Sequence, residues 1–113
     1  MNQILEIKNL NKKSEFSYLR RFGIKNKFNF ITISTLQNEN KDFKLGFQIN
    51  TKTGNAVFRN RIRRQLKHIF YQIFKKYDND PSKSGLWILV NVNPKIEKFD
   101  FSEYKSFLEK IDL

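Results

Sequence analysis

The clearest pattern of apolar positions lies between Phe58 and Ile73, where large apolar side chains recur at the spacing of an α-helix. At about 100° per residue these side chains share one arc of the helix, and basic residues occupy most of the opposite side. The pattern predicts a strongly amphipathic helix of roughly five turns. The residues of its apolar arc are Phe58, Ile62, Leu66, Ile69 and Ile73, widened by Phe70.

Two stretches before this helix have the composition of β-strands. Phe28 to Thr35 is rich in β-branched and aromatic residues, with apolar side chains on both faces. Phe43 to Asn50 alternates large apolar residues with small or polar ones. Since only a polar stretch, Leu36 to Asp42, separates them, we expect a turn there and an antiparallel pair.

Three further elements complete the expected order. Ser14 is the expected N-cap of a short helix that ends at Gly23, after an irregular lead-in from Met1 to Lys13. Leu86 to Val92 is almost continuously apolar, as in a buried strand that a crossover helix reaches. Asp100 to Ile111 begins with capping-box spacing and carries an apolar stripe, which predicts a closing helix.

The predicted order is therefore α-β-β-α-β-α. This describes an α/β sandwich of the α+β type, with a central mixed sheet and one βαβ crossover. The 113 residues contain no repeat and no linker, so we expect one domain over residues 1–113. Gly54 and Asn55, which precede the long helix, are the expected turn and helix cap.

The positive charge is concentrated on the long helix. The stretch from Phe43 to Tyr77 contains nine lysine and arginine residues and no acidic residue, so it carries +9 of the formal net charge of +11. A solvated helix face normally mixes signs to form i,i+4 ion pairs, whereas this face repels itself. Arginine predominates at its start, and the planar guanidinium suits phosphate oxygens. The pattern favours nucleic acid over a membrane surface, because the apolar side of the helix must cover the sheet.

Several kinds of site have no basis in the sequence. It contains no cysteine and one histidine, His68, which excludes disulfides and zinc knuckles. It has no phosphate-binding glycine loop and no paired acid/base carboxylates, so we expect no catalytic residue and no cofactor or metal bound by the protein itself. No apolar run approaches membrane-spanning length and the first residues lack a signal peptide, so we expect a cytoplasmic protein.

The run from Gly54 to Lys67, GNAVFRNRIRRQLK, resembles the signature of the bacterial ribonuclease P protein component. That family has Gly-Asn-Ala-Val, any residue and Arg-Asn-Arg, followed by further basic positions, and the resemblance in length and element order covers nearly the whole chain. Thr51, Arg20 and Val92 depart from the family pattern, which usually has lysine, an apolar or aromatic residue, and a basic residue there. The matching positions are Gly54, Asn55, Ala56, Val57, Arg59, Asn60, Arg61, Ile62 and Arg64.

The resemblance implies an accessory role in a ribonucleoprotein endoribonuclease. In this family a catalytic RNA, with the Mg²⁺ that it requires, removes the 5′ leader of precursor tRNA, and the protein supplies no catalytic residue. The implied partners are that RNA and the single-stranded leader, with no membrane and no further protein required. The resemblance also implies a fold like that of a ribosomal-protein domain, with a left-handed crossover that the usual right-handed rule would miss.

Two sets of binding residues follow from the resemblance. The long helix would dock on the catalytic RNA, and a cleft between the first helix and the sheet would hold the leader. Phe16 could be a base-stacking platform or a core residue, and Lys52 a phosphate contact or a solvated side chain. The RNA-docking residues are Arg59, Asn60, Arg61, Arg63, Arg64 and Lys67. The cleft residues are Phe16, Ile31, Ile33, Gln48, Asn50 and Lys52.

A different class of function also fits the basic helix. A general RNA- or ribosome-binding module with no processing role would carry the same charge pattern. Such a module would show no preference for precursor over mature tRNA. Stimulation of leader cleavage by a bacterial catalytic RNA at low Mg²⁺ would distinguish the two.

Overall fold

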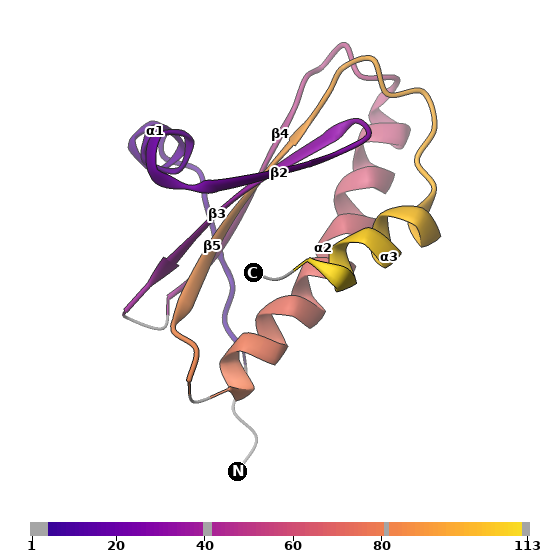
Figure 1. The fold of residues 1–113 in the computed structure, drawn as a ribbon. Helices are drawn as coiled ribbons and strands as arrows, with labels where there is room; N and C mark the ends of the chain where they lie inside the picture. Colours follow the sequence, from indigo (N-terminus) through magenta and orange to yellow (C-terminus); the bar gives the residue numbers. More distant parts are fainter. Residues whose placement is uncertain (1–4, 40–41, 81, 112–113) are drawn as a thin grey trace.

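A five-stranded mixed sheet carries one helix on one face and two helices on the other (Figure 1). The computed structural model describes residues 5–39, 42–80 and 82–111. In the described part of the chain, α1 is the helix on one face, and α2 and α3 lie together on the opposite face. The elements are β1 (Lys8–Asn9), α1 (Lys13–Phe22), β2 (Ile24–Phe28), β3 (Ile31–Asn38), β4 (Phe43–Ile49), α2 (Ala56–Asn79), β5 (Gly85–Val92) and α3 (Phe101–Lys110).

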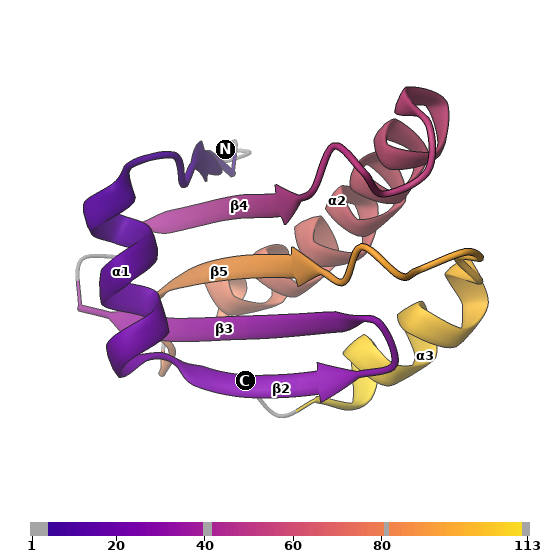
Figure 2. The same cartoon turned by 90° about the horizontal axis from the view of Figure 1, so that it is seen from above.

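The strands are ordered β1-β4-β5-β3-β2, so the last strand in sequence lies at the centre of the sheet. β5 runs parallel to β4 and antiparallel to β3. Figure 2 shows β4 and β5 pointing the same way, with β5 below β4 and α2 behind the sheet, so the β4-α2-β5 crossover is left-handed. The α/β class, the mixed sheet and the βαβ crossover are therefore confirmed.

The strand predicted over Phe28 to Thr35 is wrong in its extent, because these residues belong to two strands of a hairpin. β2 and β3 pair antiparallel, with Phe28 opposite Ile31 and a turn at residues 29–30. Asn29 has φ of 51°, a left-handed conformation that asparagine tolerates better than most residues. The polar turn predicted from Leu36 is also wrong at its start, since β3 continues to Asn38.

The predicted antiparallel pairing of the two early strands is wrong as well. β4 pairs only in parallel, with β1 and with β5, because β5 lies between β4 and β3. The lead-in contains the short strand β1, which the sequence analysis missed, while residues 1–4 lie outside the described part of the chain. α1 begins one residue before Ser14: Lys12 is its N-cap, and the Lys12 backbone N–H donates to Glu15 Oε1 at 3.2 Å.

The main core lies between the sheet and α2. The apolar arc predicted for the long helix faces this core, with Ile62, Leu66 and Ile69 buried and Phe58 and Ile73 packed at its edge. Alternate residues of β4 and β5 supply the sheet side of the core. The amphipathic pattern therefore holds α2 in one rotation about its axis, and this rotation sets which of its basic side chains point outward.

A smaller apolar cluster holds α1 on the opposite face. Leu10, Leu19 and Leu89 are buried in it, with Phe16, Leu36 and Trp87 packed around them. Glu15 of α1 also pairs with Lys44 of β4, Oε2 to Nζ at 2.5 Å, and their side chains are 9% and 18% exposed. α1 is thus attached to the sheet by few groups, which leaves much of that sheet face uncovered.

Candidate nucleic-acid interface

The start of α2 is determined by Gly54 and Asn55. Asn55 is the N-cap residue, and its side-chain oxygen accepts from the backbone N–H of Phe58 at 2.8 Å. Gly54 has φ of +52°, and a Cβ at this position would lie 2.5 Å from Cδ2 of Phe58. Both residues set the direction in which the helix leaves the sheet, and hence where its basic face lies.

Arg59 points back toward this loop. Its Nη1 donates to the backbone carbonyls of Thr51 at 2.8 Å and Gly54 at 3.0 Å, and lies 3.4 Å from that of Thr53. The side chain is only half-exposed. Arg59 therefore stabilises the loop between β4 and α2 through these hydrogen bonds. This structural role was not predicted from the sequence.

The other predicted docking residues point away from the sheet. Arg61, Arg64 and Lys67 are exposed, and the half-buried Arg63 donates from Nη1 to Oδ1 of the exposed Asn60 at 2.9 Å. The first turn of α2 contains no acidic residue. Within the described ranges none of these cations has an ion-pair partner. This outward face therefore presents cations that a polyanion can neutralise, next to the partial positive charge of the helix N-terminus.

The prediction that Ile31 and Ile33 line the cleft is wrong. Both side chains are 0% exposed and belong to the main core beneath α2. Side chains alternate across a strand, so the residues of β3 that face α1 are the intervening ones, Thr32 and Ser34. The predicted cleft residues of β3 thus lie on the face of the strand opposite to α1.

One cross-strand row of polar residues remains open beside α1. Residues directly opposite one another in register share a sheet face, and Lys27, Thr32, Asn91 and Gln48 follow one another across four strands. Lys27 and Asn91 are exposed, and Thr32 and Gln48 are half-buried. We call these four residues the polar row. It forms a surface of amides, a hydroxyl and a cation that runs across the sheet.

Two of the other predicted cleft residues, Gln48 and Asn50, lie in or beside this row. Gln48 belongs to it, and Asn50 and Lys52 follow β4 at its end, both exposed. A shallow pocket of about 310 Å³ has Gln48, Asn50, Asn91 and Pro94 among its lining residues. Phe16 is half-buried against the small cluster under α1.

The edge strand β2 adds two cations that the sequence analysis missed. Lys25 and Lys27 lie opposite Ser34 and Thr32, so both point to the α1 side of the sheet, and both are exposed. In the segment IKNKF, Lys25 and Lys27 stand two positions apart and would lie on one face of a strand. This spacing could have indicated their shared face only if the segment had been recognised as a strand.

The positive charge of the protein is consequently distributed over both sides of the sheet, the α1 side as well as the α2 side. From residue 8 to residue 38 the chain has seven lysine and arginine residues and a single acidic residue, Glu15. The partner of Glu15 is Lys44, whose hydrogen bond is the main cause that lowers the pKa of Glu15, against the opposing effect of burial. The same bond raises the pKa of Lys44. Asp42 lies beside the same segment and pairs with Lys8, Oδ1 to Nζ at 3.8 Å. The other basic residues of the segment outnumber these two carboxylates, so the α1 side of the molecule is a second basic surface.

A cavity of about 590 Å³ between α2 and α3 has a different character. Its apolar floor includes Ile73 and Leu108, and its rim mixes charges of both signs, as in Lys105 and Glu109, whose Nζ and Oε1 lie 3.8 Å apart. It carries no excess of one charge comparable to the outward face of α2. Over the described part of the chain, no group of three acidic or histidine side chains could hold a metal ion. None of the helices described there is long and apolar enough to cross a membrane.

Comparison with known proteins identifies the family. The family model described as Ribonuclease P matches residues 6–111 of this chain. The chain belongs to the ribonuclease P protein family. This family supplies the protein component of a ribonucleoprotein endoribonuclease that acts in tRNA processing.

Individual proteins that are similar to this chain in sequence or in fold are also ribonuclease P proteins. The chain is 31% identical over 105 residues to the ribonuclease P protein component of a Nitratiruptor species, covering 93% of this chain and 89% of that one. It is 32% identical over 71 residues to the component of Desulforamulus reducens, covering 63% of each chain. The fold is similar to the Thermotoga maritima RNase P protein, with a TM-score of 0.69 at 20% identity, covering 93% of this chain and 98% of that one. A Staphylococcus aureus RNase P protein mutant with defective mRNA degradation activity gives a TM-score of 0.70 at 22% identity, covering 89% and 81%.

Proposed function

We propose that this protein binds the catalytic RNA of ribonuclease P through the outward face of α2, and holds the 5′ leader of precursor tRNA beside α1. The RNA, with its bound Mg²⁺, would cleave the leader. The observation that carries the proposal is the array of exposed cations on α2 that form no ion pair within the described residues, in a chain of the ribonuclease P family. We expect this work to take place in the cytoplasm, where tRNA precursors are made.

The α2 face suits the backbone of a folded RNA. Arg61, Arg64 and Lys67 are free to contact phosphates, and each contact would release counterions, which makes binding strongly salt-dependent. Added positive charge near crowded phosphates would also lower the Mg²⁺ concentration at which the RNA works. The protein then contributes binding and electrostatics while the RNA supplies the reactive groups.

The polar row suits a single strand. Its amide and hydroxyl groups can bond to base edges or the 2′-hydroxyl, and Lys25 and Lys27 lie at the sheet edge for phosphates. Phe16, at the edge of α1, offers a partly exposed ring for stacking. Asn50 and Lys52 extend this surface beyond the end of β4.

Reconstitution with a bacterial ribonuclease P RNA at low Mg²⁺ tests the proposal. We expect the protein to stimulate leader cleavage and to increase affinity for precursor tRNA more than for mature tRNA. Lys110→Ala, which removes an exposed cation of α3 on neither surface, is the matched control for charge removal. RNA binding without stimulation, and with equal affinity for both tRNAs, would instead support a general RNA-binding module.

A further inference from the structure

A second groove lies on the other flank of α1. In the β3–β5 register, Ser34 faces Leu89 beneath the helix, Thr32 faces Asn91 in the polar row, and Leu36 faces Trp87 on the opposite side. On β5, Asn91 of the polar row comes two residues after Leu89, and Trp87 of this groove comes two residues before it. It has a volume of about 480 Å³, and its lining residues are Ser14, Glu15, Tyr18, Leu36, Gln37, Asn38 and Trp87.

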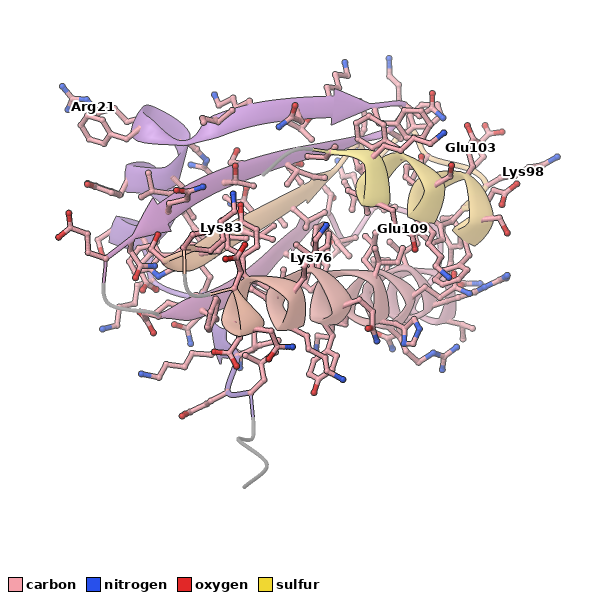
Figure 3. The ribbon with its side chains drawn as sticks, turned by 60° about the horizontal axis from the view of Figure 1, so that its bottom comes forward. Arg21, Lys76, Lys83, Lys98, Glu103 and Glu109 are labelled. Atoms are coloured by element: carbon pink, nitrogen blue, oxygen red, sulfur yellow. The ribbon has the colours of Figure 1, made fainter. Side chains whose placement is uncertain are left out.

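Exposed aromatic side chains continue from this groove along α1. Tyr18 and Phe22 are 50% and 56% exposed, and their ring centres lie 4.9 Å apart. The guanidinium carbon of Arg21 lies 5.4 Å from the centre of the Phe22 ring. Figure 3 shows Arg21 projecting outward at the end of α1. Adjacent half-exposed rings with a stacked guanidinium are a surface on which unpaired bases can stack.

The surrounding charge indicates the chemistry of the partner. The segment from residue 8 to residue 38 has seven basic residues and one acidic residue, Glu15, which pairs with Lys44. Asp42, which accepts from Nε1 of Trp87 at 3.3 Å, pairs with Lys8, so both nearby carboxylates already have a cation. The Nζ of Lys44 also lies 4.8 Å from the centre of the Trp87 ring. An anionic partner is therefore favoured over a neutral apolar one. A second copy of this chain is disfavoured, because it would bring another net charge of +11 against the same surface.

We propose that the groove and the adjoining rings of Tyr18 and Phe22 bind a second segment of single-stranded RNA, separate from the segment on the polar row. Bases would stack on the two rings, and Arg21 would contact a base or a phosphate. The strand is leader RNA that continues past α1 from the polar row, because the polar row and the groove lie on the same sheet face on either side of Leu89. Binding of single-stranded RNA by the protein itself does not require the proposed function, on which only the assignment of the strand to the leader rests.

Trp87 offers a direct measurement, because it is the one tryptophan of the chain and it lines the groove. The intact protein is titrated with a short unstructured oligoribonucleotide while tryptophan fluorescence is recorded. We expect a saturable change, and a drop in affinity of about fivefold to a hundredfold in Tyr18→Ala/Phe22→Ala, as for the loss of a base–aromatic stack. The control Lys110→Ala, on α3 and on neither proposed RNA surface, should keep the Trp87 response and the wild-type affinity.

Binding assays with the holoenzyme then test the source of the strand. We expect Tyr18→Ala/Phe22→Ala to weaken binding of precursors with long leaders and to leave precursors with short leaders unaffected. A variant that weakens assembly with the catalytic RNA whatever the leader length would overturn the assignment to the leader.

Three results would overturn the proposal. The first is a wild-type protein with no Trp87 response. The second is unchanged affinity for the oligoribonucleotide in both Tyr18→Ala/Phe22→Ala and Arg21→Glu. The third is a variant that loses self-association or capture of a protein while binding RNA normally. Failure of the wild-type protein to stimulate leader cleavage would count against the proposed function alone, since the Trp87 titration does not depend on it.

Discussion

Two arginines of α2 that stand two positions apart should respond very differently to removal. Arg61 is exposed, and it has no hydrogen-bond or ion-pair partner within the described ranges, whereas Arg59 donates to backbone carbonyls of the loop before the helix. Arg61→Ala should therefore affect RNA binding without affecting folding. Arg59→Ala should affect folding as well.

The magnitudes follow from the contacts. Arg61→Ala should reduce the slope of log affinity against log salt by about one unit, the loss of one phosphate contact, and change the free energy of unfolding by less than about 0.5 kcal/mol. Arg59→Ala removes charged hydrogen bonds of 2.8 and 3.0 Å to Thr51 and Gly54. Such bonds contribute about 1.5–3 kcal/mol, and because water can reach the freed carbonyls we expect this range for the set. That corresponds to a melting temperature lower by roughly 6–13 °C.

The assay measures thermal unfolding of the free protein and its affinity for a bacterial ribonuclease P RNA at several salt concentrations. Arg61→Ala is the matched control for Arg59→Ala, since both remove one guanidinium from the same helix. Arg59→Lys keeps the charge but cannot reproduce the planar donor geometry, so it should recover part of the salt slope and little of the stability. A fully stable Arg59→Ala protein would show that the loop does not depend on these bonds.

Three further perturbations test other parts of the structure. The hydrogen bond with Lys44 lowers the pKa of Glu15 below its ordinary 4.5, so the stabilisation from this bond is present above that value and is lost as the pH falls through the lowered pKa. Glu15→Gln should therefore show a smaller drop in melting temperature than the wild type between about pH 6 and about pH 3. An unchanged drop would contradict this role of Glu15. Gly54→Ala should lower the free energy of unfolding by at least about 1 kcal/mol in denaturant titrations, since it combines a left-handed φ with a clash against Phe58, and wild-type stability would contradict the strain. Lys27→Ala should lower the affinity for precursor tRNA and leave the affinity for mature tRNA, which has no leader, unchanged. An equal loss of affinity for both tRNAs would show that Lys27 does not contact the leader.

The long helix shows how far local pattern can go. The 3.6-residue period of Ile62, Leu66 and Ile69 determines which side is buried, and the cap at Asn55 determines where the helix begins. Both signals lie within a few residues of one another in the chain. The amphipathic helix, its outward cations and the family signature could therefore be predicted before any tertiary contact was known.

The cleft could not be predicted in the same way. Ile31 and Ile33 were assigned to it, but a strand with apolar residues on both faces gives no local indication of which face α2 will cover. The polar row forms because β5 lies between β3 and β4, which places Asn91 opposite both Thr32 and Gln48. These paired residues are more than forty positions apart in the sequence, so no local pattern indicates the pairing. Its edge cation Lys27 became visible only once the hairpin placed it opposite Thr32.

The same division holds for charge. The sequence order shows one dense basic run on α2, and its amphipathic period is enough to place that run on the outside. The seven basic residues between residues 8 and 38 are spread over α1, β2 and the segments around them, so they look diffuse along the chain. Packing of α1 against the sheet gathers several of them on one side, where two acidic residues already have ion-pair partners: Glu15 pairs with Lys44, and Asp42 pairs with Lys8. Local periodicity thus accounts for the first basic surface, and long-range strand pairing and helix packing create the second.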